Sequence, residues 1–185
     1  MRPLLFLCLA LPVPALAEGL CDVTDLARLQ MLAGTWSGVE HRSFETLDDT
    51  RMGVTPLIVT LADGGGVLTY ASDLTSGLFD EAPALTLARD GAYDVDAVDD
   101  MLDTTAHAEL ADTLSDTLCG PEALPQLVVP VSIDAEIDVE GAITLIAYFS
   151  DRLLQITEMT VRSDEVVLYV TATALLTPQT GTQLQ

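Results

Sequence analysis

Glu40, His41 and Arg42 form the one run in this chain where three different titratable or charged side chains stand side by side. In a β-strand, alternate residues face opposite sides, so Glu40 and Arg42 share a face and His41 takes the other. If Glu40 and Arg42 face inward, the pair could bind the polar head of a ligand. If the strand twists after Gly38 and the pair faces a solvated rim, it has no specific role, and the sequence leaves both interpretations open. Tyr148, on a later predicted strand, is a third candidate ligand contact.

The residues that most other catalytic and metal-binding motifs require are absent from the sequence. The chain contains no lysine, which excludes a Walker A loop and Schiff-base catalysis, and no Gly-x-Ser-x-Gly motif. His107 stands among acids without zinc-like spacing, and the acidic run from Asp94 to Asp103 lacks the glycine and closing glutamate of a calcium loop. We therefore expect no catalytic residue, no metal site and no cofactor. A weak divalent-ion site on that run and an enzyme using Glu40 and His41 remain minor alternatives.

The charge is strongly acidic, with 29 Asp and Glu against 7 Arg and a net charge of −22. Such a field repels phosphate and anionic membranes, which bind through Lys and Arg. The expected partners are a small apolar ligand or another protein, and not nucleic acid.

Residues 1–17 are typical of a secretory signal peptide. Arg2 forms a basic start, an apolar run follows, and Ala15-Leu16-Ala17 is a small-residue cleavage site. We expect a single mature domain at 18–185, periplasmic or secreted from a bacterium, with no stable membrane anchor. The absence of both Lys and Asn suggests a GC-rich bacterial genome.

Two cysteines, Cys21 and Cys119, remain after cleavage. An even pair in an exported chain predicts one disulfide bond, while two free thiols are the alternative.

The elements follow from hydrophobic periodicity and turn residues. A short helix at 22–32, capped by Asp22 or Thr24, precedes the strands, and a helical insert lies near 95–118. The predicted strands are 35–45, 53–62, 67–72, 85–89, 127–139, 142–149, 152–162 and 166–176. Short connections make neighbours antiparallel, so the fold class is mainly β, with about eight strands in an up-and-down barrel or a curled half-barrel.

Gly34-Thr35-Trp36, at the opening of the first strand after a short helix, resembles the Gly-x-Trp entry of lipocalin-like (calycin) barrels. The resemblance implies that Trp36 closes one barrel end, that Arg162 or Arg152 packs across it, and that the barrel holds an apolar ligand; some relatives hold haem. The helical insert departs from that pattern. It suggests an architectural comparison with exported lipoprotein carriers, which cover a curled sheet with helices.

The sequence therefore suggests two alternative functions, a ligand-binding protein and a protein–protein interaction module. The first is an exported, non-catalytic protein that binds a small apolar ligand near Glu40 and Arg42. The second is a periplasmic protein–protein interaction module that docks its partner through the acidic insert, beside an exposed apolar patch.

Overall fold

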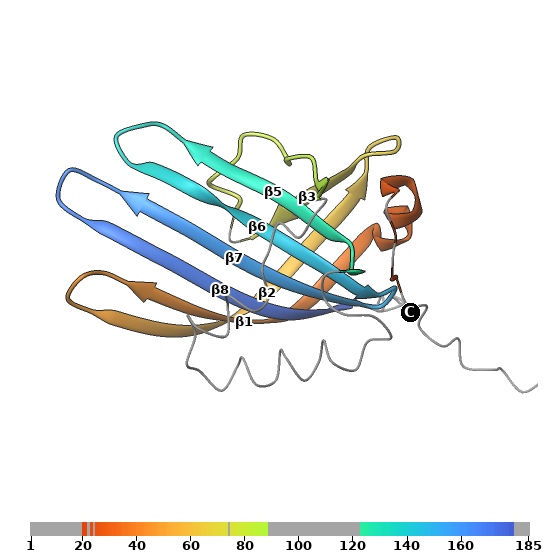
Figure 1. Cartoon of the computed structure of the whole chain (residues 1–185), viewed down its shortest axis with the longest axis horizontal. Helices are drawn as coiled ribbons and strands as arrows, with labels where there is room; N and C mark the ends of the chain where they lie inside the picture. The colour runs from red at the N-terminus through yellow and green to blue at the C-terminus, as the bar shows by residue number, and fades with distance from the viewer. Residues whose placement is uncertain (1–19, 22, 24, 74, 89–122, 180–185) are drawn as a thin grey trace, which may run out of the picture.

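Eight antiparallel strands form one curled sheet, a half-barrel, in the computed structural model of the chain, which describes residues 20–21, 23, 25–73, 75–88 and 123–179 (Figure 1). A short 3₁₀ helix, η1 (Leu26–Leu32), precedes them. The strands are β1 (Gly34–Glu45), β2 (Thr50–Asp63), β3 (Leu68–Ser72), β4 (Thr86–Ala88), β5 (Gln126–Ile133), β6 (Asp138–Phe149), β7 (Arg152–Arg162) and β8 (Val167–Pro178).

The strand order is β3-β2-β1-β8-β7-β6-β5-β4, and every neighbouring pair is antiparallel. The chain therefore runs up and down around the sheet, with β1 and β8 joining its two halves. The β1–β2, β5–β6 and β7–β8 turns lie together at one end of the sheet, which we call the hairpin end (Figure 1). The opposite end, beside η1, is the η1 end.

The segment 83–88 ties the two edges of the half-barrel. Tyr70 on β3 donates its backbone N–H to the Pro83 carbonyl (2.9 Å), and Leu85 donates to the Leu68 carbonyl (2.8 Å). The same segment continues into β4, which pairs with β5. This short segment thus pairs with β3 at one edge of the sheet and supplies β4 at the other edge, and this holds the sheet in its curled form.

Two glycines on the concave face permit the tight curvature. A Cβ at Gly38 would collide with the Leu175 carbonyl oxygen of β8, and a Cβ at Gly141 would collide with that of Glu158 on β7. Strand glycines are typical of places where two backbones approach closely at a barrel bend.

The core lies on the concave face and is closed at the η1 end. Leu29 and Leu32 of η1 are fully buried in it, and the buried Trp36 indole donates its N–H to the Leu32 carbonyl (2.9 Å). Trp36 therefore fastens η1 across the end of the sheet, because a buried indole N–H needs an acceptor.

The predicted fold class is confirmed, and so are several local predictions. At the Asp63-Gly64-Gly65-Gly66 turn, the Asp63 carboxylate accepts hydrogen bonds from the Gly65 and Gly66 N–H groups. Pro130 lies on β5 beyond the three residues that pair with β4, and so on a sheet edge, as a residue without N–H requires.

Other local predictions are wrong. Asp25, not Asp22 or Thr24, caps η1 by accepting from the Ala27 N–H (2.9 Å). The strand predicted at 127–139 ends at Ile133, because 134–137 form the β5–β6 turn, and β6 begins at Asp138 rather than at 142. The helical insert near 95–118 and the cleavage site lie outside the described residues. No helix within the described part of the chain meets the length and hydropathy that a membrane span requires.

Candidate functional site

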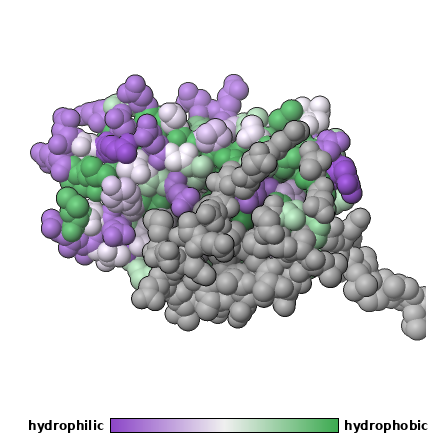
Figure 2. Space-filling model, viewed as in Figure 1, coloured by the Kyte–Doolittle hydropathy of each residue, from purple (hydrophilic) through white to green (hydrophobic). Residues whose placement is uncertain are grey.

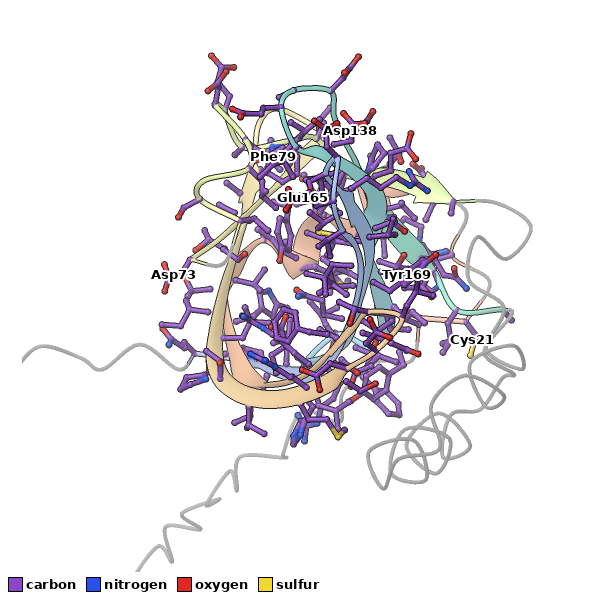
Figure 3. All side chains as sticks on the ribbon, turned by 90° about the vertical axis from the view of Figure 1, so that its left-hand side faces the viewer. Cys21, Asp73, Phe79, Asp138, Glu165 and Tyr169 are labelled. Carbon is purple, nitrogen blue, oxygen red and sulfur yellow. The ribbon has the colours of Figure 1, made fainter. Side chains whose placement is uncertain are left out.

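The concave face becomes more exposed from the η1 end toward the hairpin end. At the η1 end, its residues Trp36, Leu153 and Leu176 are buried. Near the hairpin end, the residues of the same strands and the same face, Phe44, Met159 and Val170, are partly exposed. Viewed from the hairpin end, the sheet curls around a concave side filled with side chains (Figure 3). The half-barrel is therefore closed at one end and accessible at the other.

A cluster of polar side chains lies where this exposure begins. The Glu40 carboxylate, 3% exposed, pairs with the Arg42 guanidinium, 21% exposed, and accepts from Gln155 Nε2 at 3.4 Å. Gln155 Nε2 also lies 3.5 Å from Thr157 Oγ1. We call these residues and Tyr70 the polar cluster. Buried polar groups are stable only when they satisfy one another in this way.

Two alanines on β8 allow the cluster to form. In the register of the sheet, Ala174 pairs with both Glu40 on β1 and Gln155 on β7. The next row places Ala172 between Arg42 and Thr157. Because a methyl group fills little of the space above β8, the long side chains of β1 and β7 meet across it.

Tyr70 joins the cluster from β3, on the other arm of the half-barrel. Its hydroxyl donates to Gln155 Oε1 at 3.0 Å. Burial raises the pKa of Tyr70 to about 12, with the Glu40 carboxylate adding to the shift and hydrogen bonds with Ser72 and Gln155 opposing it. Tyr70 is thus a neutral donor that tethers β3 to β7 at neutral pH.

One donor in the cluster has no partner. Arg42 Nη2 is buried and makes no hydrogen bond to any described residue. A buried cationic N–H without an acceptor is costly, so a bound molecule that offers an acceptor would be favoured once the partly exposed Arg42 side chain turns toward the hairpin end.

The structure separates the predicted site residues. Glu40 and Arg42 share the concave face, which is one of the two arrangements that the sequence left open, while His41 is exposed on the convex face. Tyr148 follows the core residue Ala147 on β6 and is buried outside the core cluster, on the convex side. Its ring contacts Phe149, with centroids 5.6 Å apart. The grouping of Tyr148 with Glu40 and Arg42 is therefore wrong, because Tyr148 lies at the irregularity between Ala147 and Phe149 and packs outside the core cluster of the concave face.

The expected packing of Arg162 on Trp36 is also wrong, and the alternative, Arg152, is instead paired with Asp151 at 3.0 Å. Trp36 pairs with Pro178 at the η1 end of β8, whereas Arg162 pairs with Val167 at the hairpin end. Arg162 instead forms an exposed ion pair with Glu140, at 2.8 Å. The pairing of Cys21 with Cys119 stays a prediction, since Cys119 lies outside the described residues.

Sequence reasoning missed Tyr70, Gln155 and Thr157. A signal was present: Gln155 and Thr157 alternate with apolar residues in Leu153-Leu154-Gln155-Ile156-Thr157, so both are polar residues inside a core strand. Their partners are up to 115 positions away along the chain, which no local pattern indicates.

Within the described residues, no group of three or more His, Cys, Asp or Glu side chains is placed to hold a metal ion. The comparisons add no relative: no protein-family model, no curated protein and no solved structure matches the chain. The candidate site is thus a polar cluster at the point where an otherwise apolar concave face becomes accessible.

Proposed function

We propose that this chain is an exported, non-catalytic binding protein that takes a small, mostly apolar ligand at the hairpin end of its half-barrel, in the manner of a lipocalin-like protein. The observation that carries the proposal is the buried, unpartnered Arg42 Nη2 at the point where the apolar concave face becomes accessible. Ligand sites typically combine apolar walls with a few convergent polar groups.

The surrounding residues define the ligand's two parts. Phe44, Met159 and Val170 are partly exposed on the concave face and offer apolar contact. Arg42 offers a hydrogen-bond donor, while Glu40 neutralises its charge. The ligand is therefore an apolar molecule with an uncharged acceptor group, such as a carbonyl, because a second carboxylate would be repelled by Glu40.

Native mass spectrometry of the protein, purified without denaturation from the cells that make it, tests the proposal. The expected spectrum contains a complex with one small molecule. The variant Met159→Asp, which places a charge on the apolar wall, loses the adduct, whereas Val67→Asp, in the exposed β2–β3 turn, retains it. A wild-type protein that is ligand-free from native cells, and that also takes up nothing from a mixture of apolar carbonyl compounds, would contradict the proposal.

A further inference from the structure

The convex face of β2, β1 and β8 carries a continuous exposed apolar surface. Val39 on β1 pairs with Pro56 on β2 and with Leu175 on β8, so the three side chains stand in one row across three strands. The large side chains of this surface are Val39 (49% exposed), Val54 (65%), Ile58 (41%) and Leu175 (40%). We call these four residues with Pro56 the apolar belt.

The belt is not an incidental scatter of apolar residues. Single exposed apolar side chains are normal, but contiguous apolar surfaces on a monomer mark interaction sites. Along β2, the belt residues Pro56 and Ile58 alternate with Leu57 and Val59 of the core, so this part of the strand is apolar on both faces. A half-barrel that only had to fold would place polar residues on this convex face.

Charge identifies the kind of partner. The belt itself contains no charged side chain; His41, between Val54 and Thr173, is the one titratable group among its pairs. Toward the hairpin end the convex side becomes acidic, with Glu45 and Glu158 on the strands and Asp48, Asp49, Asp164 and Glu165 in the turns. The two arginines at the hairpin end are already paired with acidic residues, Arg51 with Asp49 (2.8 Å) and Arg162 with Glu140 (2.8 Å). Figure 2 shows hydrophobic residues next to hydrophilic ones at the hairpin end of the molecule.

We propose that the apolar belt is a docking surface for a protein segment with an apolar centre and a basic flank. The apolar centre would cover the belt, and the basic flank would meet the acidic hairpin end. A second copy of this chain is disfavoured because each copy carries a net charge of −22, and an anionic membrane is disfavoured for the same reason. The belt lies on the convex face, so its occupant is independent of the ligand proposed for the concave face.

The test uses two synthetic peptides of equal positive charge. One is an amphipathic helix with a leucine face and a lysine face, and the other has serine in place of every leucine. The leucine peptide is expected to bind the full-length protein at least about tenfold more tightly, because only it buries apolar area on the belt. Binding is measured by isothermal titration calorimetry, and it weakens as salt is added because the flank contact is electrostatic.

Matched variants place the effect on the belt. Val39→Ser with Leu175→Ser should reduce the preference for the leucine peptide to near unity. The control, Val67→Ser with Met31→Ser, removes side chains of similar exposure (42% and 52%) elsewhere and should leave the preference unchanged. Circular dichroism of both double variants verifies that they are folded.

Three results would overturn the proposal. The first is equal binding of the two peptides to the wild-type protein, which would reduce the effect to net charge. The second is an equal loss in the belt and control variants. The third is a wild-type dimer in analytical ultracentrifugation that dissociates in the belt variant while peptide binding is unaffected, which would assign the belt to a second copy.

Discussion

The buried ion pair between Glu40 and Arg42 gives the sharpest prediction for stability, because its two partners differ in exposure. The Glu40 carboxylate is 3% exposed and the Arg42 side chain 21% exposed. Arg42→Leu leaves a buried carboxylate whose remaining contact is the 3.4 Å hydrogen bond from Gln155. Removing one partner of a buried pair typically costs 3–5 kcal/mol, and we expect about 3 kcal/mol here, because the Gln155 hydrogen bond remains.

Replacing the other partner, Glu40, should reduce the free energy of unfolding by less. After Glu40→Leu, the long Arg42 side chain can turn its guanidinium toward the accessible hairpin end, so we expect a loss of about 1–2 kcal/mol. The double variant, with leucine at both positions, leaves no uncompensated charge and should lose no more than Glu40→Leu alone. The two effects are therefore strongly non-additive, with a coupling of about 3 kcal/mol.

Urea denaturation followed by fluorescence measures these free energies of unfolding. Trp36 is the single tryptophan of the chain and is buried at the η1 end, so its emission reports global unfolding. Removing Arg162 or Glu140, an ion pair that is 48% and 65% exposed, serves as the control and should change stability by less than about 1 kcal/mol. Equal and additive losses for the Glu40 and Arg42 variants would refute the reasoning, since they would show that neither charge is buried in solution.

Four further predictions follow from individual contacts. Gly141→Ala should destabilise the protein by about 1–3 kcal/mol in urea denaturation, because the new Cβ would collide with the Glu158 carbonyl, and a neutral result would contradict the close approach of β6 and β7. Tyr70 has a pKa of about 12 in the folded state against 10 in the unfolded chain. Its contribution to the free energy of unfolding is therefore complete below pH 10 and falls by about 3 kcal/mol as the pH rises toward 12. Tyr70→Phe should remove this loss of stability at alkaline pH. If the variant and the wild-type protein lose stability equally between about pH 10 and 12, the assignment to Tyr70 is refuted. Partial burial raises the pKa of Glu158, so ionisation of this carboxyl group favours the unfolded chain. Glu158→Gln should therefore raise the melting temperature at neutral pH, and this gain should disappear below about pH 4.5. A gain that does not depend on pH would show that the stabilisation has another cause. Trp36→Phe removes the hydrogen bond to η1 and should increase hydrogen exchange in η1 more than in β6, whereas a uniform increase would show that the indole does not fasten η1.

The sequence alone determined the class of fold, because its main signals are local. Alternation of apolar residues sets which face of a strand is buried, and the Asp63-Gly64-Gly65-Gly66 run sets a hairpin, since both depend on residues within a few positions of one another. It also placed Glu40 and Arg42 on one face, because strand parity does not depend on the partner strand.

Only the tertiary structure decided which side chains meet. Gln155 reaches Glu40 because β8 lies between their strands and presents the small Ala174 at that row, a matter of register between segments more than a hundred residues apart. The same register places Arg162 at the opposite end from Trp36. A strand's own residues determine which side chains share a face, but the packing of the whole sheet determines which side chains of other strands they contact. The candidate site depends on these contacts between strands.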